Sequence, residues 1–315
     1  MPFSRDVKEE LAHVPVKRAP VRRAELSGLA RFSGGIGRNA QGLFLSFATD
    51  YNSVAQRILA HLKAGYRIDA DMLGIRREKL NKGIRYHVRV GGADAARLMR
   101  DIGLLEDEVG GASLVAGIAE RVVPSAAEVS AYLRGAFMAS GSIQNPDRAY
   151  HLEFVTQNQR IGQELLGLIA NIDLNAKLTR RRDHYVVYLK EAEHIVELLG
   201  RMGAHKAVFE IENVRILKGI RNDINRSTNL QAANIDKSSS AAANQIRSIG
   251  ILEREGLLRK LPLPLRQAAD IRIEYPDATL QELADHLPGV SRSGVNHRLR
   301  RLVEMAEKLL ESKEE

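Results

Sequence analysis

The sequence predicts an α+β fold over its first two thirds and an all-α module at its C-terminus. The same order of helical and alternating patterns occurs twice, over about residues 20–104 and again over about 126–205. Each repeat opens with a helix of small residues that ends in Ser-Gly, LSGLARFSGG at 26–35 and LRGAFMASGS at 133–142. Beyond residue 261 we find only helical spacing. We expect an internal duplication followed by a helical domain; the alternative is a chance likeness of two α+β patterns.

The composition excludes several classes of protein. Of the 315 residues, 44% are hydrophobic and 27% are charged, which is typical of globular domains rather than disordered chains. No cysteine is present, so disulfides, thiolate metal sites and cysteine nucleophiles are excluded. No apolar run approaches the roughly 18–20 residues that cross a bilayer, and the first residues mix acids and bases. We expect a cytoplasmic protein with no signal peptide and no membrane partner.

The two repeats predict matching elements in matching order, because apolar residues recur at helical spacing or alternate at strand spacing in the same sequence of segments. The first repeat predicts a helix (21–34), a glycine turn (34–37), a strand (43–50), a helix (50–65), a hairpin (75–90) bent at Asn81-Lys82-Gly83, and a helix (94–105). The second predicts a helix (129–142), a strand (150–156), a helix (159–172), a hairpin (175–190) turning at Arg181-Arg182-Asp183, and a helix (191–203).

The chain then changes character. A Gly-rich segment over 109–125 joins the repeats, and residues 206–261 are rich in Asn, Ala and Ser, which predicts a helical, basic linker. We therefore expect a duplicated domain over 1–205, this linker, and a separate helical domain over 262–315.

Basic residues gather in clusters. The net charge is +8 and the pI is near 9.7, which favours a polyanionic partner, although such a surplus can also serve solubility. Residues 15–38 contain six basic residues and one acid, Glu25. Residues 76–89 contain six basic residues and one acid, Glu78. A third cluster leads into the second hairpin; it comprises Lys177, Arg180, Arg181 and Arg182. Three clusters of one sign favour double-stranded DNA as the partner.

The repeated helix resembles the signature of the LAGLIDADG homing endonucleases. In its first copy the pattern matches Leu26, Gly28, Leu29 and Gly34, and in its second Leu133, Gly135, Ala139 and Gly141. The resemblance implies that the two helices pack closely through their small residues. It also implies that the last turn of each would point an acid at metal ions shared with the scissile phosphates. The simpler alternative is a tight-packing glycine in an ordinary core helix.

The acidic position of that signature holds a hydroxyl in both copies, Ser33 and Ser140. A neutral hydroxyl is a poor lone ligand for Mg²⁺, and no Asp or Glu stands one turn away to replace the missing acid. We therefore expect no catalytic residue, no metal, no cofactor and no enzymatic activity.

Motifs along the whole chain resemble the WhiA family, described as regulators of sporulation septation, cell division and chromosome segregation. The motifs are SRDVKEELA, RAELSGLARFSGG, YLRGAFMASGSIQNP, YHLEFVT, GRMG, IRNDINRSTNLQAANIDK and SRSGVNHRLRRL. The resemblance implies a duplicated αββαββα LAGLIDADG-like domain, without nuclease activity, fused to a C-terminal helix-turn-helix. It also implies a nucleoid-associated transcriptional regulator, with a second transcription regulator or RNA polymerase holoenzyme as possible partners.

The last 54 residues predict a helix-turn-helix on their own pattern. A helix over 265–275 precedes TLQELADHL, whose apolar residues lie on one helix face: Leu280, Leu283, Ala284 and Leu287. Thr279 and Glu282 form a capping box, Pro288-Gly289 makes the turn, and Ser291 can cap the final helix. In that helix we expect these residues to face inward: Val295, Leu299, Leu302, Val303, Ala306 and Leu309.

The opposite face of the final helix predicts DNA reading. Arginine and asparagine pair two-pronged with guanine and adenine edges, while serine and histidine add single contacts. The expected base-reading residues are Arg292, Ser293, Asn296, His297 and Arg300, and Arg298 and Arg301 are expected on phosphates. The alternative is a solvated arginine face on a dimerisation helix.

Further DNA contacts are possible outside this helix. The linker places Asn and Arg side chains on one helical side, which would suit DNA or a bridge between domains. The candidates are Arg221, Asn225, Arg226 and Lys237, together with Arg180, Arg181 and Arg182 of the second hairpin.

Three functions are consistent with this sequence pattern. A sequence-specific, non-cleaving DNA-binding regulator is favoured. An active homing endonuclease is disfavoured by Ser33 and Ser140. An architectural or RNA-binding protein using the basic sheet is disfavoured by the low aromatic content of 5%, because single-strand readers stack bases on aromatic rings.

Overall fold

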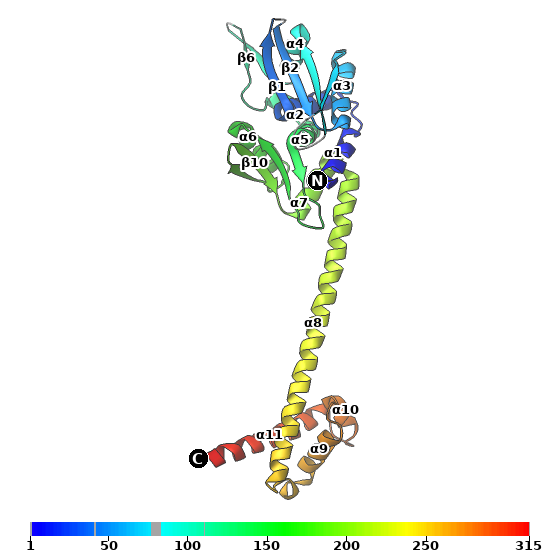
Figure 1. The fold of residues 1–315 in the computed structure, drawn as a ribbon, viewed down its shortest axis with the longest axis vertical. Helices are drawn as coiled ribbons and strands as arrows, with labels where there is room; N and C mark the ends of the chain where they lie inside the picture. Colours follow the sequence, from blue (N-terminus) through cyan, green and yellow to red (C-terminus); the bar gives the residue numbers. More distant parts are fainter. Residues whose placement is uncertain (1, 41, 77–82, 110, 315) are drawn as a thin grey trace. The chain divides into compact units, whose positions relative to one another are not determined.

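The computed structural model describes residues 2–40, 42–76, 83–109 and 111–314, which divide into two compact units, 1–217 and 218–315 (Figure 1). Asn81 and Lys82, two of the three residues of the expected bend at Asn81-Lys82-Gly83, lie outside the described residues. The division between the units falls within one long helix, α8 (His205–Arg254).

The first unit holds the two repeats, and their topologies are identical. The first repeat comprises α2 (Ala19–Ser33), β1 (Gly34–Asn39), β2 (Gly42–Thr49), α3 (Asn52–Tyr66), β3 (Met72–Arg76), β4 (Ile84–Gly91) and α4 (Gly92–Asp101). The second comprises α5 (Ala126–Ser140), β7 (Gly141–Ile143), β8 (Leu152–Thr156), α6 (Gln159–Ala170), β9 (Lys177–Arg181), β10 (His184–Leu189) and α7 (Ala192–Met202). Their antiparallel sheets have the strand orders β1-β2-β4-β3 and β7-β8-β10-β9. The expected duplication of an αββαββα unit is confirmed.

Elements outside the repeats complete the first unit. A helix that the sequence analysis left unassigned, α1 (Pro2–Ala12), precedes the first repeat and buries Phe3, Val7 and Leu11. Between the repeats, β5 (Leu105–Glu108) pairs antiparallel with β6 (Gly111–Leu114), and a 3-10 turn, η1 (Glu120–Val122), follows.

The expected glycine turn at 34–37 is wrong, because these residues begin strand β1. Gly34 pairs with Phe47, and Gly37 pairs with Phe44. A Cβ on Gly37 would lie 2.3 Å from the Phe44 ring, so the aromatic side chain occupies the space that a side chain at 37 would need. Gly37 therefore serves close packing across the ladder.

Helices α2 and α5 cross in close contact, side by side between the two sheets (Figure 1). A Cβ on Gly28 would lie 2.3 Å from the carbonyl oxygen of Tyr132, and one on Gly135 would lie 2.2 Å from that of Glu25. Each motif glycine thus packs directly against the backbone of the other helix. This is the close approach that the small residues of the signature imply.

A buried ionic cluster ties this helix pair to its surroundings. The Glu25 carboxylate is fully buried and accepts from Arg57 Nε at 2.6 Å and from Arg134 Nε at 2.7 Å. His61 Nε2 lies 2.8 Å from Glu25 Oε1, and because an ionised carboxylate can only accept, this nitrogen carries the proton. Arg134 also donates to the carbonyl of Met202, at the end of α7.

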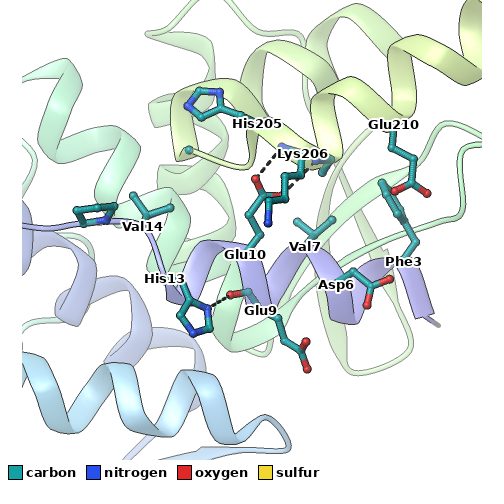
Figure 2. A pocket seen from close by; sticks show the side chains of 13 residues that line it. Phe3, Asp6, Val7, Glu9, Glu10, His13, Val14, His205, Lys206 and Glu210 are labelled. Atoms are coloured by element: carbon teal, nitrogen blue, oxygen red, sulfur yellow. Dashed lines mark hydrogen bonds between the residues drawn. The ribbon is translucent and has the colours of Figure 1, made fainter.

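The start of α8 docks on α1 within the first unit, beside a hollow of about 700 Å³ (Figure 2). Glu10 on α1 accepts hydrogen bonds from the backbone N–H groups of Lys206 and Ala207, at 2.7 and 3.2 Å. These N–H groups have no partner inside their own helix, so Glu10 caps α8 from a distant part of the chain.

The second unit is entirely helical over the residues that the structure describes. After α8 it contains η2 (Leu258–Lys260), α9 (Leu263–Glu274), α10 (Leu280–Asp285) and α11 (Arg292–Glu314). Its core buries Ile249 and Leu252 of α8 against the three shorter helices. The residues expected to face inward on α10 and α11 lie in or against this core, with the exception of Val303. Met305, which was not expected there, packs against the core.

Candidate nucleic-acid interface

Three local devices fix the orientation of α11. Thr279 caps α10 in a complete capping box with Glu282, which confirms the expected start of that helix. Gly289 adopts a φ of +76°, a left-handed conformation that glycine reaches without strain and that turns the chain toward α11. The Ser291 hydroxyl then accepts from the backbone N–H of Gly294 at 3.2 Å, as expected of its cap.

A buried arginine that sequence reasoning missed holds the connection between α9 and α10 in place. Arg272 on α9 is 2% exposed and donates to the carbonyls of Pro276 and Ala278, at 3.3 and 2.7 Å. Burial lowers the pKa of this guanidinium. Arg272 therefore fixes the path from α9 into α10; an arginine within a helical pattern carries no signal of this role.

The five expected base-reading side chains share the solvent side of α11. Val295 and Leu299 are fully buried, and the residues expected to read bases lie on the opposite, exposed side of the helix. The exposed residues are Arg292, Ser293, Asn296, His297 and Arg300. Arg300 lies 3.8 Å from Glu304 with both side chains largely exposed, a weak pair that a stronger anion can displace.

The two arginines expected on phosphates differ from each other. Arg301 is exposed, whereas Arg298 is half-buried and its guanidinium lies 3.5 Å from the Pro264 carbonyl at the start of α9. Arg298 therefore also contributes to packing between α11 and α9.

The expected contacts on α8 are all exposed: Arg221, Asn225, Arg226 and Lys237. Arg226 pairs with Asp223 one turn away at 3.2 Å. These side chains are open to solvent on the second unit's part of α8.

The three hairpin arginines do not act as one group. Arg180 and Arg181 are consecutive strand residues and point to opposite faces of the sheet. Arg180 stacks over the Tyr185 ring, while Arg181 donates to the Glu153 carboxylate at 3.2 Å. Arg182 lies in the turn with a φ of +52°. The Glu153 carboxylate already compensates the one arginine that shares its sheet face.

The first sheet instead carries a cationic row that the site prediction omitted. Val88 and Val90 of β4 are buried against the helices, so the alternate residues Arg85, His87 and Arg89 face the other side. The Arg89 guanidinium stacks over Phe44 of β2, 4.4 Å from the ring centre. We call this side the open face of the first sheet. Its arginines belong to the basic cluster over 76–89, of which 77–82 lie outside the described residues.

Ser33 and Ser140 meet at one hollow of about 420 Å³, which we call the serine hollow. Ser33 donates to the carbonyl of Leu29 at 2.8 Å. Among the described residues, the lining contains no carboxylate; it consists of Arg31, Phe32, Ser33, Gly34, Arg85, Ser140, Val155, Thr156, Gln157, Asn158 and His184. Within the same described ranges we find no group of three or more His, Cys, Asp or Glu side chains placed to hold a metal ion.

Comparison with known proteins identifies the family. The WhiA N-terminal LAGLIDADG-like domain matches residues 20–105, the WhiA LAGLIDADG-like domain matches 129–221, and the WhiA C-terminal HTH domain matches 224–306. The "Probable cell division protein WhiA" of Thermoanaerobacter pseudethanolicus is 40% identical over 314 residues, which is 99% of both chains. The chain belongs to the WhiA family. A second relative, from Desulfitobacterium hafniense, has the same name and is 39% identical over 99% of this chain and 97% of its own.

Solved WhiA structures share the fold. Full-length WhiA from Thermotoga maritima aligns with a TM-score of 0.60 at 23% identity, over 97% of this chain and 98% of that one. The N-terminal LAGLIDADG domain of WhiA aligns with a TM-score of 0.51 at 20% identity, over 64% and 90% of the two chains. The WhiA architecture of a LAGLIDADG-like region followed by a helix-turn-helix is thus present here. Over the described residues, no helix is long and apolar enough to cross a membrane.

Proposed function

We propose that this WhiA protein is a sequence-specific DNA-binding transcriptional regulator that acts in cell division and chromosome segregation, and in sporulation septation in spore formers. The exposed row on α11 carries the proposal, since it holds side chains that discriminate base pairs on a helix that a capped turn orients. The name of the relatives, probable cell division protein, supports the cellular role. Such a regulator works in the cytoplasm at the nucleoid, with a second regulator or RNA polymerase holoenzyme as its protein partner.

Within this row, the roles follow from hydrogen-bonding capacity. Arg292 and Arg300 suit the two acceptors of guanine, and Asn296 suits the donor and acceptor of adenine. Ser293 and His297 add single contacts. Arg301 would bind phosphate, and Arg298 would do so while it packs against α9.

The proposal includes the absence of DNA cleavage. Both motif helices end in serine at the position where the endonuclease signature has an acid. Hydroxyls without carboxylates do not hold Mg²⁺ against its hydration shell, so no metal-activated attack on a phosphate is expected.

Selection of bound fragments from sheared genomic DNA tests this function. Purified full-length protein is incubated with the fragments in Mg²⁺, and bound DNA is sequenced. A short recurring motif in intact fragments is expected, and Arg300→Ala should lose the preference at one position of it. Enrichment without a motif would contradict sequence-specific regulation, and fragment ends gathered at one sequence would reveal cleavage.

One observation favours a second candidate, an architectural DNA-binding or RNA-binding protein. The open face of the first sheet presents Arg85, His87 and Arg89 on strands that carry no acid, and Asp50, just after β2, lies 3.8 Å from Arg85. Such a surface binds phosphates without reading bases. Under this candidate, Arg300→Ala leaves the affinity nearly unchanged for every sequence.

A further inference from the structure

The serine hollow has the charge of an anion site rather than of a metal site. Its lining brings together the guanidinium groups of Arg31 and Arg85 and the imidazole of His184. Hydroxyl and amide groups surround these side chains, including Ser33, Ser140 and others of the lining. A cation would meet only neutral oxygens there, whereas a phosphate would meet charged donors.

Two of the lining residues each have a buried polar atom without a hydrogen-bond partner among the described residues. They are Ser140 Oγ and Arg31 Nε. An unpaired buried donor is unfavourable, so an acceptor placed beside either atom would offset that loss. Arg31 is otherwise held in place, because another of its nitrogens donates to the carbonyl of Gly103 at 3.0 Å.

Two carboxylates that interact with these arginines, Asp50 and Glu164, lie outside the lining. A carboxylate oxygen of Asp50 lies 3.8 Å from the Arg85 guanidinium. Glu164 interacts electrostatically with Arg31. The Glu164 carboxylate also accepts hydrogen bonds from Arg160 and from the backbone N–H of Ile118. Neither carboxylate occupies the hollow. The described lining of the hollow therefore presents both guanidinium groups without a carboxylate among them.

We propose that the serine hollow binds a phosphate group directly, without a metal ion, at the place where the endonuclease signature would put its catalytic acids. The inference rests on the proposed absence of cleavage. The phosphate can come from a free pyrophosphate-type ligand, such as a nucleotide, or from the DNA backbone. Arg31 and Arg85 supply the charge, and Ser140 supplies the hydroxyl that has no hydrogen-bond partner among the described residues.

Calorimetric titration of full-length protein with inorganic pyrophosphate in EDTA tests the site. We expect saturable binding that weakens at least about tenfold in Arg85→Gln, since a charge-assisted hydrogen bond is lost. Ser140→Asp should abolish binding, because a carboxylate in the hollow repels the ligand. Arg201→Gln is the matched control, as this arginine is similarly exposed and also pairs with a carboxylate, but lies on α7 away from the hollow.

DNA titrations distinguish the two sources of phosphate. If the backbone supplies it, Arg85→Gln lowers the slope of log affinity against log salt by about 0.9, and pyrophosphate competes with DNA. If a free ligand supplies it, pyrophosphate binds while the salt slope is unchanged. Ser140→Ala, a small change that is expected to fold, should weaken binding in either case.

Absence of pyrophosphate binding together with an unchanged salt slope in Arg85→Gln would overturn the inference. Equal weakening in Arg85→Gln and Arg201→Gln would overturn it too, since it would show a diffuse charge effect. Neither result touches the reading of bases by α11, which Arg300→Ala tests separately. Cleavage in Mg²⁺, by contrast, would refute the proposed function and this inference together.

Discussion

At the scale of single residues, the crossing of α2 and α5 depends on two glycines. Any side chain at Gly28 or Gly135 would meet the backbone of the other helix within 2.4 Å, and backbone cannot move aside like a flexible side chain. We expect Gly135→Ala to destabilise the protein by at least about 2 kcal/mol, measured by urea unfolding.

Gly167→Ala on α6 is the control for that substitution. A Cβ at Gly167 meets nothing within 4 Å, so alanine should stabilise the helix by up to about 1 kcal/mol. If Gly135→Ala were as well tolerated as Gly167→Ala, the close crossing of α2 and α5 would be contradicted.

The buried carboxylate of Glu25 makes stability depend on pH. Burial alone would raise the pKa of Glu25, but hydrogen bonds from His61 and Arg57 and the charge of Arg134 hold it well below its usual value of 4.5. Burial lowers the pKa of His61, and its bond to Glu25 offsets only part of this effect. Both shifts mean that the unfolded chain binds protons more readily than the folded one.

The free energy of unfolding should therefore fall as the pH decreases, first below about 6.5 for His61 and then below about 4.5 for Glu25. Urea unfolding at a series of pH values measures this. Glu25→Gln should cost about 3–5 kcal/mol at neutral pH, because it leaves two arginines buried without their anion. A constant midpoint of unfolding between pH 7 and 4 would refute this account.

At the scale of elements, the cap of α8 comes from a helix almost 200 positions away. Glu10 accepts from the first N–H groups of α8, and its negative charge also suits the positive end of the helix. We expect Glu10→Ala to destabilise the first unit by about 1 kcal/mol in thermal unfolding. Glu9→Ala should have a smaller effect, since Glu9 forms an exposed pair with Arg5. Equal effects would contradict the capping role.

The elements that the sequence predicted well are those with local signals. The Thr279–Glu282 capping box and the apolar stripes of α10 and α11 depend on residues within two turns of each other, and the structure has them. Strand β1 was missed because its glycines acquire strand character only from Phe44 and its neighbours across the ladder. Likewise Glu25 stood out as a lone acid, but its partners lie 32 to 109 positions away.

At the scale of the whole molecule, clustering of charge in the sequence did not predict which basic residues share a surface. The cluster of three hairpin arginines is divided between two sheet faces, and one of them is compensated by Glu153. Arg85 and Arg89, four positions apart on one strand, share a face instead. Alternation along a strand, rather than the number of bases in a window, decides where the positive charge lies.

This difference gives a prediction for the complete protein on DNA. If the open face of the first sheet lies along the phosphates, Arg89→Gln should weaken binding to all sequences alike. It should also lower the slope of log affinity against log salt by about 0.9, because one fewer counterion is released. Arg181→Gln should leave the slope unchanged, since Glu153 already compensates that charge. Affinities measured by fluorescence anisotropy between about 50 and 200 mM salt resolve such slopes.

If both variants keep the slope of the unaltered protein while Arg300→Ala still alters sequence preference, the helix-turn-helix binds DNA alone. The first sheet would then be a scaffold or a surface for a protein partner.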